Sequence, residues 1–222
     1  MDTPISVDIW SDIACPWCYI GKRRFERALE EFAADAANPP VTVRFHSFEL
    51  APDTPLDFDG SEIDFLTSYK GMPPEQVTQM LDHVTNLAQQ VGLDYDFGSV
   101  KHTKTIKAHE LVHFAHAHSK EAEMMERLMR AYFVEGRHVG RIDALVDLAA
   151  DVGLDRELAL NALEQGTYSS DVSADKTQAA EYGINGVPFF VFDGAYGVSG
   201  AQEPETFSEV LREVVSRQGD NK

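Results

Sequence analysis

The two cysteines of this 222-residue chain are separated by only two residues, in the segment Cys15-Pro16-Trp17-Cys18. An apolar run over 5–10 leads into them and a helical pattern follows, so Cys15 is expected where a strand ends and a helix begins. Unpaired N–H groups and the dipole at a helix N-terminus favour the thiolate form of a cysteine. Because a thiolate attacks disulfides and a second thiol one turn away can complete the exchange, the spacing predicts thiol–disulfide chemistry at Cys15 and Cys18.

Two other uses of a cysteine pair are less favoured. A structural disulfide across four residues gains about 2 kcal/mol from chain entropy, which a chain of this length does not need. Zinc requires four ligands, and the sequence contains no second cysteine pair. The interpretation therefore includes no metal and no organic cofactor.

Charge and composition narrow the range of partners. The chain carries 19 Lys and Arg against 37 Asp and Glu, a formal net charge of −18. This balance argues against binding to nucleic acid or to anionic membranes. The N-terminus lacks the basic region of a signal peptide, and no apolar run approaches membrane-spanning length, so we expect a cytoplasmic protein. A mature secreted form would show the same features.

The first elements form a unit around the cysteines. A strand is predicted over 5–11, a helix over 16–37 and a second strand over 41–48. Strand, helix, strand in this order predicts two parallel strands, with the cysteines at the carboxyl end of the first.

The middle of the chain shows helical periodicity only. Helices are expected near 62–70, from Pro73-Pro74 to Gly92, and near 104–118, 121–135, 142–152 and 155–165. The pattern predicts an all-helical insertion over 59–168, with 1–58 and 169–222 forming one domain around it.

Strands return at the end of the chain. A helix over 170–182 precedes a strand over 187–192, an Asp193-Gly194 hairpin turn and a strand over 195–199. A final helix is expected over 203–217. The fold class is therefore α/β, with the order βαβ, helical insertion, αββα.

This order resembles the thioredoxin fold, and particular motifs resemble the DsbA-like family and its cytoplasmic FrnE-type oxidoreductases. The motifs are Trp10, Asp12, Cys15 to Cys18 and Gly21 near the start, Thr103 with Ala108 to Leu111 in the middle, and 186–190 with 199–202 near the end. The resemblance implies that Cys15 is an exposed nucleophile and Cys18 the resolving thiol. It also implies a cis peptide bond at Val187–Pro188 beside the sulfurs, where the Val187 backbone would pair with a substrate. Pro16 and Trp17 would contact the substrate as well.

The dipeptide between the cysteines departs from periplasmic DsbA proteins, which usually carry histidine where this chain has Trp17. An imidazolium there would stabilise the Cys15 thiolate, and this chain lacks it. We therefore expect a less oxidising couple than that of DsbA, whose potential is about −120 mV. Some FrnE-type proteins carry a second cysteine pair near the C-terminus. This chain has none.

Several other side chains could take part. Asp12 could accept the proton of Cys18, cap the following helix or hold the loop, and capping is favoured. His109, which the family pattern singles out, could approach the thiols from the insertion. With His113 and His116 it has a spacing that could hold a metal, although packing and surface roles are favoured. Met124, Met125, Met129, Tyr132 and Phe133 could line a peptide groove, but their spacing favours a core.

The favoured function is therefore a thiol–disulfide oxidoreductase acting on protein or small-molecule thiols and disulfides, including glutathione, as a monomer or homodimer. The alternative is a glutathione-dependent isomerase or transferase, resembling the hydroxychromene-carboxylate isomerases and kappa-type transferases. Those proteins generally carry serine at the first cysteine position, so Cys15 favours exchange chemistry. A third class, accessory proteins of polyketide pathways, is attached to the FrnE name.

Overall fold

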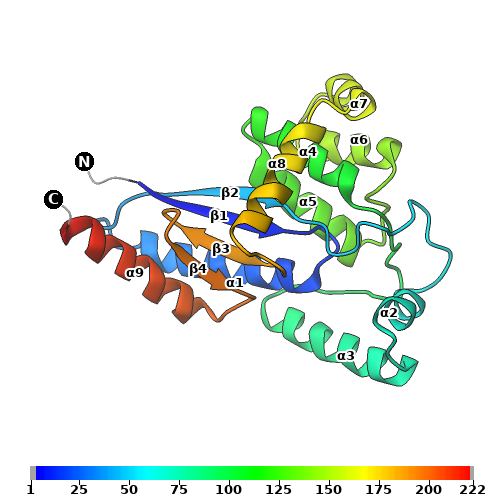
Figure 1. Cartoon of the computed structure of the whole chain (residues 1–222), viewed down its shortest axis with the longest axis horizontal. Helices are drawn as coiled ribbons and strands as arrows, with labels where there is room; N and C mark the ends of the chain where they lie inside the picture. Colours follow the sequence, from blue (N-terminus) through cyan, green and yellow to red (C-terminus); the bar gives the residue numbers. More distant parts are fainter. Residues whose placement is uncertain (1–3, 221–222) are drawn as a thin grey trace.

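The computed structural model describes residues 4–220, and within them a four-stranded mixed sheet has the order β2-β1-β3-β4 (Figure 1). Strands β1 (Ile5–Ser11) and β2 (Val41–Ser47) are parallel and are joined by helix α1 (Pro16–Ala33). Strands β3 (Phe189–Phe192) and β4 (Tyr196–Ser199) form an antiparallel hairpin, and β3 is also antiparallel to β1. This arrangement confirms the α/β class and the thioredoxin-like order of elements.

The expected middle and terminal helices are present. They are α2 (Glu62–Lys70), α3 (Pro74–Gln90), α4 (Ile106–Ala117), α5 (Glu121–Phe133), α6 (Ile142–Asp151), α7 (Arg156–Gln165), α8 (Ser169–Glu181) and α9 (Pro204–Asp220). One continuous cluster of buried apolar side chains includes residues of β1, of α1, of the middle helices α3 to α7 and of α9. The division of the chain at 58/59 and 168/169 stays a prediction.

Helix α1 ends four residues earlier than the sequence predicted, at Ala33 instead of residue 37. The Asp35 carboxylate accepts a hydrogen bond from the backbone N–H of Ala37, and the Asn38 side chain donates to the Phe32 carbonyl at 2.7 Å. These side chains replace helical hydrogen bonds with a local turn. The helix therefore stops before the prolines at 39 and 40.

The two faces of the sheet pack against different helices. Phe190 and Phe192 alternate with Val191 along β3. The two phenylalanine side chains therefore point to one face of the sheet and Val191 to the other. On one face Phe190 packs against Phe25 of α1 and Phe207 of α9, with ring centroids 5.3 and 4.6 Å away. On the other face, Val191 lies in a small buried cluster with Trp10, Ile184 and Ala179 of α8. The sheet is thus covered on both sides. The cysteine segment follows the carboxyl end of β1, one of its two central strands.

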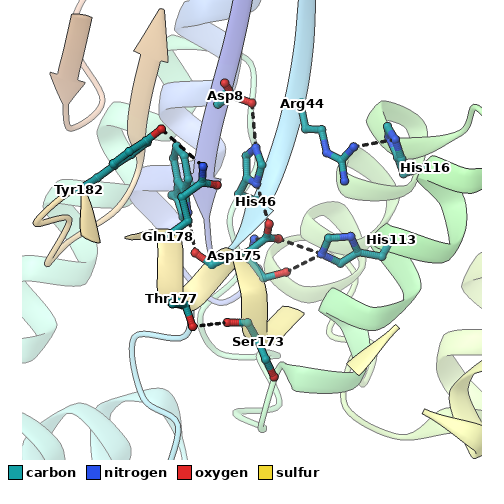
Figure 2. A network of polar contacts seen from close by, with 12 residues as sticks. Asp8, Arg44, His46, His113, His116, Ser173, Asp175, Thr177, Gln178 and Tyr182 are labelled. Atoms are coloured by element: carbon teal, nitrogen blue, oxygen red, sulfur yellow. Dashed lines mark hydrogen bonds and ion pairs between the residues drawn. The ribbon is translucent and has the colours of Figure 1, made fainter. Parts of the chain in front are cut away.

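A buried polar network joins the sheet to α8 and α4 (Figure 2). The His46 imidazole lies between the carboxylates of Asp8 and Asp175, 2.8 and 2.7 Å from them. Asp175 of α8 also contacts His113 Nε2 at 2.9 Å and accepts the backbone N–H of Ser47. Four segments distant in sequence, β1, β2, α4 and α8, are therefore held together by one set of polar contacts.

Candidate active site

Cys15 lies where β1 has ended and α1 begins. It is the N-cap residue of α1, with extended backbone angles (φ −96°, ψ 110°), and Pro16 occupies the first turn, where its missing N–H is harmless. Cys18 lies one turn further, and its backbone N–H donates to the Cys15 carbonyl at 3.0 Å. Both thiols are free, so the structure represents the dithiol form.

The two thiols are electrostatically different. Burial raises the pKa of Cys18 well above its ordinary value, and the neighbouring Cys15 sulfur raises it further. Cys15 instead lies at the N-terminal end of α1. Cys18 is therefore the buried thiol that keeps its proton, and Cys15 is the thiol that precedes the helix.

Cys15 is not exposed, which corrects the implication of the resemblance. The residue retains only 2% of its accessible surface. Its thiol donates to the Val187 carbonyl at 3.6 Å, and the Val187–Pro188 bond is cis, as the resemblance implied. Val187, before β3, contacts the Cys15 thiol, and Tyr95 of the insertion contacts the Pro16 carbonyl, so both segments lie against the start of α1.

A cavity of about 480 Å³ gives access to this region. Cys15, Pro16, Trp17 and Val187 line it on one side, and the loop after β2, α2, α3 and the segment before α4 line the rest. Exposed Leu50 and Tyr69 also belong to its lining, so the cavity reaches the surface. Cavities of this size accommodate small organic ligands. Pro188 lies next to the cavity residue Val187, and Trp17, 37% exposed, is accessible to a partner.

Asp12 holds the loop rather than capping the helix, which corrects the favoured interpretation. In the part of the chain that the structure describes, the N-cap residue of α1 is Cys15, and no side-chain capping hydrogen bond is formed there. The Asp12 carboxylate instead accepts hydrogen bonds from the Leu50 N–H at 2.8 Å, the Thr105 hydroxyl at 2.9 Å and the Ala14 N–H at 3.3 Å. Burial alone would raise the pKa of Asp12, but His109, the Leu50 N–H and the Thr105 hydroxyl hold it below the ordinary value. Asp12 is therefore a charged tie between the cysteine loop and the insertion.

His109 is buried on α4 and points toward that tie. Its Nε2 lies 3.4 Å from Asp12 Oδ1, an orientation too poor for a hydrogen bond. His113 and His116 contact other partners, Asp175 and Arg44. Among residues 4–220, no group of three or more His, Cys, Asp or Glu side chains is placed to hold a metal ion. The predicted methionine and aromatic cluster of α5 is buried, as its spacing favoured.

Comparison with known proteins agrees with this geometry. The model of the DsbA-like thioredoxin domain matches residues 6–212. The chain belongs to this family. The uncharacterized protein YwbO of Bacillus subtilis (strain 168) is 30% identical over 210 residues, 93% of this chain and 96% of that protein.

Solved structures show the same fold. The probable DsbA oxidoreductase SCO1869 of Streptomyces coelicolor is 39% identical, with a TM-score of 0.87 over 96% of this chain and 90% of that one. The cytosolic disulfide reductase DsbM of Pseudomonas aeruginosa, solved with GSH, is 18% identical, with a TM-score of 0.66 over 95% and 99%. The second likeness is one of fold alone.

Two features of this DsbA-like site were absent from the sequence interpretation. The Tyr95 hydroxyl donates to the Pro16 carbonyl at 2.8 Å and so fixes the first turn of α1 from the insertion. Glu62 and His102 form a buried pair that also lines the cavity. No spacing in the sequence indicates the Glu62–His102 pair, because the two residues are forty positions apart and meet only in the folded chain. Among the described residues, no helix combines the length and apolarity needed to cross a bilayer.

Proposed function

We propose that this protein is a thiol–disulfide oxidoreductase in which Cys15 is the nucleophile and Cys18 the resolving thiol. The observation that carries the proposal is the pair of free thiols at the start of α1, with burial raising the pKa of Cys18. The Cys15 thiolate attacks a substrate disulfide and forms a mixed disulfide. Cys18 then loses its proton, attacks Cys15 and releases the substrate as a thiol.

The covered position of Cys15 favours small substrates over folded proteins. A residue 2% exposed is poorly accessible to a disulfide on a protein surface, whereas the cavity of about 480 Å³ admits a small molecule. Glutathione and its disulfide have suitable size and chemistry, and DsbM, which shares this fold, was solved with GSH. We assign the protein to the FrnE-type branch, acting in the cytoplasm, on the motifs at its two ends.

The test compares the reduced wild type with Cys15→Ser and Cys18→Ser on two oxidants, glutathione disulfide and insulin. The wild type should reduce glutathione disulfide faster than insulin in molar terms, and Cys15→Ser should be inactive on both. Cys18→Ser should stop after one exchange, with the mixed disulfide at Cys15 detected by mass spectrometry.

The outcome also separates the rival function. Glutathione-dependent isomerisation that survives Cys18→Ser, with no disulfide reduction by the wild type, would assign the protein to the isomerase and transferase class. That class needs one activating group at position 15 and has no use for a resolving thiol.

A further inference from the structure

A fixed glutamate–histidine pair stands in the wall of the cavity that contains Cys15. His102 Nδ1 lies 2.8 Å from Glu62 Oε2, and both residues retain only 7% of their surface. The Phe65 ring stacks on the imidazole with centroids 3.4 Å apart, and the Tyr132 hydroxyl lies 3.1 Å from the same Nδ1. Glu62, Phe65 and His102 all line the cavity. The imidazole is therefore held in one orientation in the wall of the cavity.

The two ring nitrogens of His102 have different surroundings. Nδ1 faces Glu62 and Tyr132, so it carries a proton toward the carboxylate. Nε2 has no hydrogen-bond partner among residues 4–220. It is also not fully enclosed by the described part of the protein. Since His102 lines the cavity and Nδ1 is already engaged, Nε2 is the ring nitrogen left for a cavity ligand.

A base oriented by a carboxylate and open to the same space as a nucleophile is the arrangement used for proton transfer. We propose that His102, oriented by Glu62, exchanges a proton with the sulfur of a small thiol or disulfide bound in the cavity. This inference rests on the proposed function, and it adds the group that handles the substrate proton. Glu62 is the positioning residue of the pair.

The reductive half-reaction starts from the Cys15 thiolate, the Cys18 thiol and a small disulfide R–S–S–R. The Cys15 thiolate attacks one sulfur of R–S–S–R, the new bond joins Cys15 to that sulfur, and the old S–S bond breaks. The departing R–S⁻ takes a proton from Nε2 of His102 and leaves as R–SH. Cys18 attacks the Cys15 sulfur, the bond between Cys15 and the substrate sulfur breaks, and the proton lost by Cys18 ends on the second R–S⁻, which leaves as R–SH. The substrate disulfide is reduced to two thiols, and Cys15 and Cys18 become a disulfide.

This role predicts a dependence on the leaving group. An alkyl thiolate is basic and needs a proton on departure, whereas an aromatic nitrothiolate leaves as a stable anion. His102→Gln should therefore slow reduction of glutathione disulfide by about 100-fold, the lower end of what general acid catalysis contributes. It should leave the rate with 5,5′-dithiobis(2-nitrobenzoate) unchanged. Both rates are measured with the reduced full-length protein, in single turnover.

His113→Gln is the matched control, because His113 is also a buried histidine paired with a carboxylate but lies outside the cavity lining. It should change neither rate. Glu62→Gln should give a smaller loss than His102→Gln, again confined to glutathione disulfide, and serves if the histidine variant does not fold.

Equal slowing of both substrates, or of neither, would overturn the role of His102 while leaving the proposed function intact. If the wild type reduces neither substrate, the proposed function itself fails. Cys15→Ser in the same assay distinguishes these cases, since it must abolish any true exchange.

Discussion

We expect Trp17 to be the residue that most directly affects the potential of the Cys15–Cys18 couple. It lies beside Cys18, is 37% exposed and replaces the histidine usual in periplasmic DsbA proteins. A histidine cation there would stabilise the Cys15 thiolate and so the reduced form. We predict a wild-type potential below about −120 mV, and a rise of roughly 30 mV or more, about 1.4 kcal/mol, in Trp17→His.

A glutathione redox titration with quantification of the two oxidation states measures both potentials. Trp17→Phe is the control, because it keeps an aromatic ring without a charge and should stay near the wild type. A wild-type potential as high as that of DsbA, or a fall in Trp17→His, would contradict the assignment of the effect to charge.

At the scale of elements, Gly21 lets α1 pack closely against two neighbouring segments. A Cβ on Gly21 would lie 2.9 Å from Pro188 Cγ and 3.3 Å from Ala201 Cα, so α1 approaches the segment beside Val187 and the end of the hairpin closely. Alanine favours helix over glycine by about 1 kcal/mol, whereas overpacking costs about 1–3 kcal/mol. We predict that Gly21→Ala lowers the free energy of unfolding and slows the reaction of Cys15, because Pro188 must move.

Urea denaturation and the rate of Cys15 alkylation measure the two effects. Gly219→Ala is the matched control, since Gly219 also lies in a helix but a Cβ there would meet no atom of residues 4–220 within 4 Å. It should not lower stability. A Gly21→Ala protein as stable and reactive as the wild type would show that this contact is not tight.

These elements also show what the sequence can and cannot predict. The strands, most helix bounds and the turn at Asp193-Gly194 follow from local periodicity and turn chemistry, which short segments determine by themselves. The early end of α1 depends on where the Asp35 and Asn38 side chains bond, which an alanine-rich pattern does not indicate. The burial of Cys15 and the Glu62–His102 pair depend on packing between distant segments, and periodicity carries no information about that.

At the scale of the whole molecule, the network of Figure 2 links stability to pH. Burial works to lower the pKa of His46, but the carboxylates of Asp175 and Asp8 raise it to about 9. The Trp10 ring stacks on the same imidazole at 4.4 Å, and the Trp10 indole donates to the Asp175 carbonyl. Protonated His46 thus holds α8 against the two parallel strands.

A raised histidine pKa contributes stability that is complete below the unfolded value of about 6.5 and is lost as the pH rises through about 9. The shift corresponds to about 3 kcal/mol, shared with the two carboxylates. We predict that His46→Gln is less stable than the wild type by this order near pH 6, and that the difference shrinks steadily toward pH 10. Urea denaturation across this range measures it, with His83→Gln, an exposed histidine of α3, as control. A difference that does not vary with pH would mean that His46 acts through packing against Trp10 rather than through its charge.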